Sequence, residues 1–258
     1  MRNPRTILIT GASSGLGAAL AEVYAADGTT FALIGRNEER LEAVAARCRA
    51  QGAQAECATI DVTDAAALAA WIADIDDRAP LDLVIANAGI SGGTSGGEGE
   101  DQARRIFAVN LDGVLNTVLP VIPRMRARRR GQIALMSSLA AFRGFPGAPA
   151  YCATKAAVKH WGEALRGTLR GDGVEVSVIC PGFVRSAMTD ANPFPMPMLM
   201  DSGRAAALIK RRLARNAARI AFPWPMYAAV WFFGMLPPLI TDPLFARLPE
   251  KPTLPEDV

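Results

Sequence analysis

The stretch TILITGASSGLG, residues 6–17, decides the fold because it joins an apolar strand pattern to a glycine-rich turn. Residues Thr6–Thr10 are apolar or β-branched, as expected of a parallel strand that is buried on both faces. Gly11, Gly15 and Gly17 permit a tight turn and let backbone N–H groups approach a pyrophosphate at the start of a helix. The spacing Gly-x3-Gly-x-Gly lacks the Gly-Lys-Ser/Thr of a P-loop. It therefore predicts a turn that binds a dinucleotide.

Strand and helix patterns alternate along the rest of the chain. The predicted strands are Thr6–Thr10, Thr30–Ile34, Ala55–Ile60, Leu81–Ala86, Gln132–Ser137, Val174–Ile179 and Arg219–Phe222. The predicted helices include Ala18–Ala26, Arg40–Ala50, Ala65–Ala73 and the basic segment Arg204–Arg219. This alternation predicts an α/β fold with right-handed crossovers, in which helices cover both faces of a Rossmann-like, doubly wound parallel sheet of about seven strands. We expect one domain over residues 1–258, with a cofactor and catalytic core in 1–186 and a small substrate flap and apolar C-terminal segment in 187–258.

The composition argues against several classes of function. Half of the 258 residues are hydrophobic and the formal charge is only +3, so we expect a buried core and no nucleic-acid partner. The single histidine, His160, excludes a zinc site built on several histidines, and we expect no metal. We interpret His160 as a helix residue with a structural hydrogen bond. The cysteines form no Cys-x-x-Cys pair and only Met1–Arg5 precede the first apolar run, which favours a reduced, cytoplasmic protein without a signal peptide.

The end of the second predicted strand bears on which dinucleotide is bound. It reads Ile34-Gly35-Arg36-Asn37, with no carboxylate before Glu38 to hydrogen-bond the ribose 2′-hydroxyl of NAD. The guanidinium of Arg36 can instead pair bidentately with a 2′-phosphate. This pattern favours NADP(H) over NAD(H), and the alternative is a solvated arginine at the start of the next helix.

Tyr151 and Lys155 lie four residues apart in a predicted helix, so their side chains share one face. A nearby ammonium and a positively charged nicotinamide would stabilise the phenolate and bring the tyrosine pKa towards neutrality. Tyr-x3-Lys is also common on exposed helix faces, and the pair alone therefore does not define a site.

Taken together, the ordered motifs between Thr6 and Ser186 resemble the short-chain dehydrogenase/reductase family in its single-domain form. The motifs that carry this resemblance are Thr10-Gly-x3-Gly-x-Gly17, Asp61 after the third strand, Asn87-Ala-Gly89, Asn110 in Val-Asn-Leu, Ser138 thirteen residues before Tyr151, Tyr151-x3-Lys155, and Pro181-Gly182. The resemblance implies an oxidoreductase that interconverts a ketone or aldehyde and an alcohol. The cofactor contacts that it implies are Gly11, Ser13, Ser14, Gly15, Leu16, Gly17, Arg36, Asp61, Val62, Asn87, Ala88, Gly89, Tyr151, Lys155, Pro181, Gly182, Val184 and Ser186.

The resemblance also implies a role for each member of a catalytic set. Ser138 would hold the substrate oxygen while Tyr151 donates a proton to it. Lys155 would lower the tyrosine pKa and bind the nicotinamide ribose, and Asn110 would connect Lys155 through water to solvent. Ser137 is the neighbouring alternative to Ser138, but alternation along the strand points it the other way.

The chain departs from the family pattern near the cofactor site. Ser186 stands where the family commonly has threonine, and Ser14 where many NADP-dependent members carry a basic residue. Arg36 must therefore carry the NADP preference largely alone. The glycine-rich stretch Ser91–Gly99 is predicted to be a mobile loop beside the site. We interpret Cys152, next to Tyr151, as a packed thiol.

The last third of the chain breaks the strand–helix rhythm. The resemblance implies that Pro193–Met200 closes over the substrate, and its methionines suit a hydrophobic one, although packing against Ile220–Ile240 would explain them equally well. Prolines leave only Met226–Leu236 uninterrupted, which is too short to span a membrane. The uncharged stretch 220–240 is a strand followed by a helix buried in a subunit contact, which we favour, a wall of the substrate site, or an element that rests peripherally on an anionic membrane surface.

Three functions remain open from the sequence. The leading hypothesis is an NADP(H)-dependent carbonyl reductase or alcohol dehydrogenase, for which the resemblance implies a homodimer or homotetramer. The alternatives are a cofactor-binding regulatory protein without turnover and a membrane-surface ketoreductase acting on lipid. Binding alone would not need Tyr151, which argues against the regulatory protein.

Overall fold

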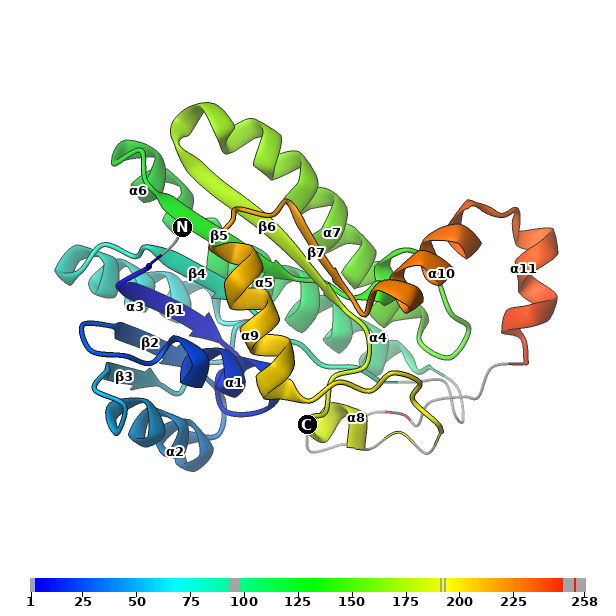
Figure 1. Ribbon diagram of the computed structural model, residues 1–258, viewed down its shortest axis with the longest axis horizontal. Helices are drawn as coiled ribbons and strands as arrows, with labels where there is room; N and C mark the ends of the chain where they lie inside the picture. The colour runs from blue at the N-terminus through cyan, green and yellow to red at the C-terminus, as the bar shows by residue number, and fades with distance from the viewer. Residues whose placement is uncertain (1–2, 93–97, 191, 193, 248–252, 254–258) are drawn as a thin grey trace.

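The computed structural model describes residues 3–92, 98–190, 192, 194–247 and 253. Its parallel sheet has seven strands in the order β3-β2-β1-β4-β5-β6-β7 (Figure 1). The strands are β1 (Thr6–Thr10), β2 (Thr30–Ile34), β3 (Gln54–Ala58), β4 (Leu83–Ala86), β5 (Gly131–Met136), β6 (Val174–Pro181) and β7 (Arg219–Phe222). The helices are α1 (Gly15–Tyr24), α2 (Glu38–Arg49), α3 (Ala65–Arg78), α4 (Glu100–Phe107), α5 (Gly113–Val118), α6 (Val121–Ala127), α7 (Pro149–Leu169), α8 (Ala187–Asp190), α9 (Ser202–Leu213), α10 (Trp224–Met235) and α11 (Pro238–Phe245). The doubly wound α/β fold predicted from the sequence is confirmed.

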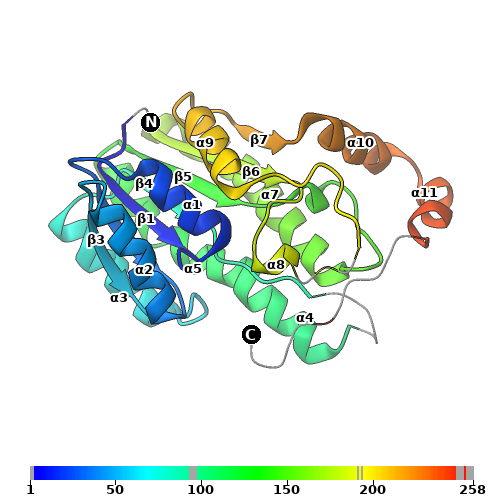
Figure 2. The ribbon, with the colours of Figure 1, turned by 60° about the horizontal axis from the view of Figure 1, so that its bottom comes forward.

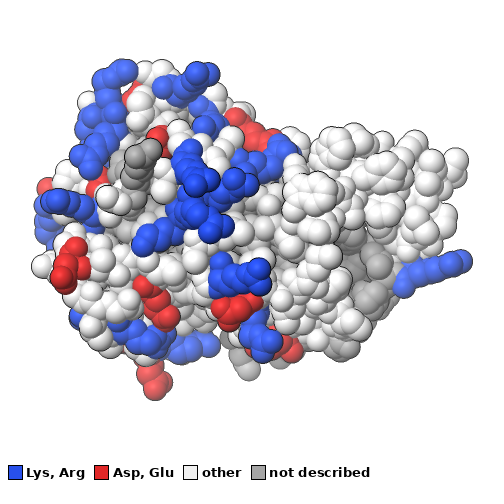
Figure 3. Space-filling model, in the orientation of Figure 1, with Lys and Arg blue, Asp and Glu red and all other residues white. Residues whose placement is uncertain are grey.

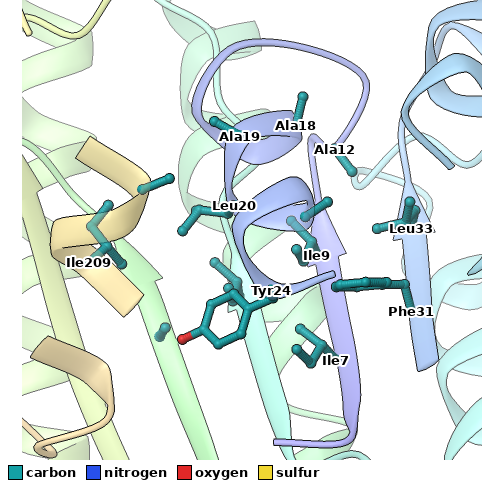
Figure 4. Close-up of a cluster of buried hydrophobic side chains, with 14 of the residues drawn as sticks. Ile7, Ile9, Ala12, Ala18, Ala19, Leu20, Tyr24, Phe31, Leu33 and Ile209 are labelled. Atoms are coloured by element: carbon teal, nitrogen blue, oxygen red, sulfur yellow. The ribbon is translucent and has the colours of Figure 1, made fainter. Parts of the chain in front are cut away.

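Helices cover both faces of the sheet because side chains alternate along each buried strand (Figure 2). Ile7 and Ile9 of β1 face one layer, which contains α1, α2 and α9. Leu8 faces the opposite layer, which contains α3 to α7. In the first layer, Leu20 and Tyr24 of α1 lie between β1 and Ile209 of α9 (Figure 4). The strand order reverses between β1 and β4, and this places a ligand crevice at the carboxyl ends of these two strands.

Most strands begin and end within two residues of their predicted limits. β3 ends at Ala58 instead of Ile60 because the chain turns at Asp61, whose carboxylate accepts a hydrogen bond from the Thr63 amide at 2.9 Å. β4 starts at Leu83 instead of Leu81, since the Leu81 amide donates to the carboxylate of Asp76 at 2.8 Å. β6 continues beyond Ile179 to Pro181, where it still pairs with β7.

The predicted helix Arg204–Arg219 is too long at its C-terminal end. α9 stops at Leu213, and Asn216 adopts the left-handed backbone conformation with φ +50°. The guanidinium of Arg166, on α7, donates to the side-chain oxygen of Asn216 at 2.6 Å and to its backbone oxygen at 3.1 Å. This contact between distant parts of the chain turns the backbone into β7 and ends the helix.

Other local expectations concern single residues and the loop after β4. His160 Nδ1 lies 2.9 Å from the carbonyl oxygen of Ala156 within α7, and the predicted structural hydrogen bond is therefore confirmed. Asp64 caps α3, since its carboxylate accepts from the Ala67 amide at 3.0 Å. Residues 93–97 of the predicted mobile loop lie outside the described residues.

One continuous helical stretch, Glu100–Ala127, has the length and apolar composition of a membrane span within the described part of the chain. It packs against the sheet through Ile106, Val114 and Val118, which are buried. The stretch therefore packs as a helix of the protein core, and 44% of its most apolar 18 residues are buried.

Helix α7 approaches the sheet closely at Gly162, and this contact offers a test of the packing. A Cβ atom at Gly162 would lie 2.5 Å from Leu135 Cδ1 and 2.7 Å from Val178 Cγ2. Replacing Gly162 by alanine should therefore lower the free energy of unfolding by about 1–3 kcal/mol through overpacking, as measured by urea denaturation.

Gly167 provides a matched control on the same helix, because a Cβ atom there would meet no heavy atom within 4 Å. Gly167→Ala should raise the free energy of unfolding by about 0.5–1 kcal/mol through helix propensity. Equal effects of the two substitutions would contradict the packing of α7 on β5 and β6.

Candidate active site

A cavity of about 1050 Å³ opens at the carboxyl ends of β1 and β4, where the strand order reverses. Every residue that the sequence analysis assigned to cofactor binding lines this cavity. Three of the four predicted catalytic residues, Ser138, Tyr151 and Lys155, line the same space, and the fourth, Asn110, is fully buried. The fold therefore brings together residues that are up to 175 positions apart in the sequence.

The glycine-rich turn has the geometry of an anion cradle. Gly11 and Gly15 adopt positive φ angles of +66° and +55°, and a Cβ atom at Gly17 would lie 2.2 Å from the carbonyl oxygen of Gly11. Ser14 precedes α1 without a side-chain capping hydrogen bond, so the first N–H groups of this helix stay available to a ligand. Asn87 holds the turn against β4, because its Nδ2 donates to Thr10 O at 2.9 Å. The turn thus fits the pyrophosphate of a dinucleotide.

Two arginines line the end of the cavity that adjoins β2. Arg36 lies two residues after the end of β2, and Arg40 lies in the first turn of α2. Glu38 and Glu39 point elsewhere and are not among the lining residues. Arg40 was not predicted as a site residue, although it is the first residue of the predicted helix Arg40–Ala50 and stands only four positions after Arg36. This end of the cavity is suited to an anionic group.

Lys155 and Asn110 converge beneath Gly89 at the inner end of the cavity. A Cβ atom at Gly89 would lie 3.2 Å from Asn110 Oδ1 and 3.3 Å from Lys155 Nζ. Lys155 Nζ donates to the carbonyl oxygen of Met136 at 3.0 Å and lies 5.6 Å from the ring centroid of Tyr151. Lys155 is thereby held between β5 and the tyrosine.

The side chain of Asn110 joins the end of β4 to α7. It lies in a π-helical turn, Ala108–Asp112, between α4 and α5. Its Oδ1 accepts from the Ile90 amide at 2.8 Å, and its Nδ2 donates to Ile90 O at 2.9 Å and to Thr154 Oγ1 at 3.3 Å. These contacts give Asn110 a positioning role, and the water link to Lys155 stays a prediction.

Ser137 and Ser138 point in opposite directions, in the manner that strand alternation predicts. The hydroxyl of Ser137 is buried and donates to the carbonyl oxygen of Lys155 at 2.7 Å. The hydroxyl of Ser138 accepts from the Ala140 amide at 3.1 Å, donates to Pro181 O at 3.5 Å, and lines the cavity together with Tyr151. Ser138 and Tyr151 thus present two neighbouring hydroxyl groups to the cavity.

Burial shifts the pKa values of the tyrosine and the lysine in opposite directions. Desolvation raises the pKa of Tyr151 to about 12, although the hydrogen bond to Ser138 opposes this shift. Desolvation lowers the pKa of Lys155 to about 8. Burial is thus the largest influence on the Tyr151 pKa in the protein alone, and the lowering of this pKa by Lys155 together with an oxidised nicotinamide stays a prediction.

An apolar wall encloses the part of the cavity that is not formed by the glycine-rich turn, the two arginines or the catalytic residues. Its side chains come from the loop before α7, from the segment after β6 and from the last two helices; they include Phe145, Phe183, Met188, Phe194, Met226, Val230, Phe233 and Phe245. In the predicted flap, Phe194, Pro195 and Pro197 line the cavity, whereas Met198 is 53% exposed and Pro193 lies outside the described residues. The flap methionines are thus not the residues that line the cavity.

Helices α10 and α11 form a part of the wall that the sequence analysis did not assign to the site. α10 is apolar around its whole circumference, so its sequence has no periodic pattern to mark an inner face. Cys152 also lines the cavity, where burial raises the pKa of its thiol and its Sγ accepts from the Phe145 amide at 3.4 Å.

The lowered pKa of Lys155 gives a direct prediction by NMR. The chain contains four lysines, 155, 159, 210 and 251, so a sample labelled with ¹³C-lysine has few Cε resonances. We expect one resonance to titrate near pH 8, and to be absent from Lys155→Met. Because the pKa of Lys155 in the folded protein lies below its ordinary value of 10.5, the neutral amine is favoured in the fold, and the free energy of unfolding rises as the pH rises from about 8 to 10.5. Titration of all four lysines above pH 10 would contradict the burial of this ammonium.

Comparison with known proteins agrees with this arrangement. A family model described as short chain dehydrogenase matches residues 5–194. An uncharacterized oxidoreductase of Myxococcus xanthus is 40% identical over 246 residues, which are 95% of this chain and 97% of that protein. A ketoacyl reductase of Nostoc is 34% identical over 182 residues, which are 70% of this chain and 63% of that protein. The solved structure of a short-chain dehydrogenase from Sphingobium yanoikuyae in complex with NADPH has a TM-score of 0.79 at 28% identity and covers 95% of this chain and 96% of that one. The chain belongs to the short-chain dehydrogenase/reductase family of oxidoreductases.

Proposed function

We propose that the protein is an NADP(H)-dependent oxidoreductase that interconverts a ketone or aldehyde and an alcohol, and that its substrate is hydrophobic. One observation carries this proposal: a single cavity joins the glycine cradle and two arginines to the hydroxyl groups of Ser138 and Tyr151. When bound, the nicotinamide supplies the hydride, and the protein has to position the substrate and move a proton. We further propose a cytoplasmic protein that forms a homodimer or homotetramer.

The two hydroxyl groups at the inner end of the cavity act on the substrate oxygen. Ser138 holds this oxygen by a hydrogen bond, and Tyr151 donates a proton to it during reduction. A tyrosine with a pKa of about 12 is protonated at neutral pH and therefore carries the proton that it must give up. Lys155, whose pKa is about 8, is largely protonated at neutral pH, and its charge stabilises the phenolate that remains.

The preference for NADP(H) rests on the two guanidinium groups that line the cavity next to β2. Arg36 and Arg40 both offer planar, bidentate donors to a 2′-phosphate. The NADPH complex of the Sphingobium yanoikuyae relative, at 28% identity, supports a cofactor of this kind.

The apolar wall supports a neutral, hydrophobic substrate. Among the described residues that line the reacting end of the cavity, Lys155 is the only one with a charged side chain. A carboxylate or phosphate on the substrate would therefore lose its hydration without a partner at the apolar wall. The ketoacyl reductase of Nostoc, at 34% identity, supports the reduction of a carbonyl group.

The substitution Tyr151→Phe tests the proposed acid, because it keeps the ring and removes the hydroxyl group. The variant should bind NADPH as tightly as the unaltered protein and reduce apolar ketones about a thousandfold more slowly, a loss typical of a missing general acid. The measurements are NADPH fluorescence for binding and NADPH oxidation for turnover. Turnover that survives the substitution would contradict the role of Tyr151, and NADPH binding without turnover in the unaltered protein would favour a regulatory function.

The substitution Arg36→Leu tests the cofactor preference. Loss of a charge-assisted pair should raise the KM for NADPH about tenfold to a hundredfold and leave the KM for NADH unchanged. Arg47→Leu is the matched control, because Arg47 lies on α2 outside the cavity and pairs with Glu22 at 2.7 Å. An equal rise of both KM values in Arg36→Leu would show that Arg36 does not bind a 2′-phosphate.

A further inference from the structure

Helices α10 and α11 extend from the end of the sheet beyond β7 (Figures 1 and 2). Their inner side lines the cavity through Met226, Val230, Phe233 and Phe245. Their other side carries large apolar side chains exposed to solvent, which we name the apolar outer face: Trp224, Trp231, Phe232, Met235, Leu239 and Leu244. α10 and α11 thus present apolar side chains both to the substrate cavity and to the solvent.

The apolar outer face is too exposed to belong to the core of this chain. The exposed fraction is 72% for Trp224 and 87% for Leu239, and it is about half for the other members. Figure 3 shows acidic and basic side chains spread over the body of the molecule, while the extension formed by α10 and α11 is uncharged on this side except near its tip. A soluble monomer rarely exposes a patch of this kind without a function for it.

Charges border the apolar outer face and do not interrupt it. Asp242 is the one carboxylate in the two helices, and Arg143 neutralises it with an ion pair of 2.9 Å. The guanidinium of Arg143 also lies over the ring of Phe245, 5.2 Å from its centroid. Arg219, at the start of β7 and five residues before α10, pairs with Glu163, and Arg247 follows α11. Three arginines thus stand against the two carboxylates that pair with them, so the border is cationic by one charge, which complements anionic lipid headgroups.

Lipid matches this surface better than a protein partner does. Protein interfaces form about one hydrogen bond per 100–200 Å² of buried area, whereas only the two indole N–H groups of the apolar outer face can hydrogen-bond. Hydrocarbon forms no hydrogen bonds, and tryptophan prefers the boundary between hydrocarbon and water. α10 has 12 residues, which is about 18 Å of helix, against about 30 Å of hydrocarbon in a bilayer. The segment can lie in the bilayer surface but cannot cross it.

We propose that α10 and α11 bind the surface of a lipid bilayer through the apolar outer face. This contact places the apolar wall of the cavity next to the membrane, where a hydrophobic substrate concentrates. The proposal goes beyond the proposed reaction and does not depend on it, because lipid binding is measured without turnover. A subunit contact, which the sequence favoured, is the competing outcome of the test.

The test is flotation of the full-length protein with vesicles of phosphatidylcholine and phosphatidylglycerol in equal amounts. We expect the unaltered protein to float with the vesicles, and Phe232→Glu and Leu239→Glu to reduce the bound fraction about tenfold, since each places a carboxylate in the hydrocarbon boundary. Leu119→Glu is the matched control: Leu119 is 53% exposed between α5 and α6, and this variant should float like the unaltered protein.

Two further measurements distinguish the outcomes. Brominated lipid should quench the fluorescence of Trp224 and Trp231, and the quenching should disappear when both become phenylalanine while Trp71 and Trp161 remain. Circular dichroism confirms that each variant is folded. Failure of the unaltered protein to float, or equal flotation of Leu239→Glu, would overturn the proposal. So would light scattering in which the unaltered protein is an oligomer that Leu239→Glu dissociates, because the apolar outer face would then be a subunit contact.

Discussion

Desolvation of Tyr151 and Lys155 is the constraint on which the rest of the site depends. Lys155 is buried and Tyr151 is partly buried, because α7 packs directly on β5 and β6 and Gly89 lies close to the lysine nitrogen. Without solvent, the uncharged form of each group is favoured, so the tyrosine keeps its proton and the lysine holds its proton more weakly. Burial thereby moves the pKa values of the two groups in opposite directions, and Tyr151 keeps the proton that it must donate.

The parallel sheet places the cofactor site next to Tyr151 and Lys155. The reversal of strand order between β1 and β4 creates one crevice, and Asn87 and Asn110 fasten its walls to the glycine turn and to α7. The polar groups of both asparagines bond to backbone or side chains of other elements, which makes the relative placement of the turn and α7 rigid.

The sequence predicts those features that depend on local patterns. Thr30–Ile34 and Arg219–Phe222 are strands over the predicted residues, since runs of buried apolar and β-branched side chains have few alternatives. The end of α9 was missed because a contact from Arg166 to Asn216, fifty residues away, decides it. The inner face of α10 was missed because a helix that is apolar all round carries no periodicity. The rise of the Tyr151 pKa was missed because burial is a property of the packed fold, whereas a neighbouring lysine is visible in the sequence.

We infer that burial keeps Tyr151 protonated until the positive charge of an oxidised nicotinamide in the same cavity lowers its pKa. Ultraviolet difference titration of the three tyrosines, compared with that of Tyr151→Phe, measures the pKa of Tyr151 with and without NADP⁺. We expect Tyr151 to stay un-ionised up to about pH 11 in the protein alone, and its pKa to fall by about 2 units or more when NADP⁺ is added. Ionisation of Tyr151 near pH 10 without cofactor, or a pKa that NADP⁺ leaves unchanged, would contradict the account.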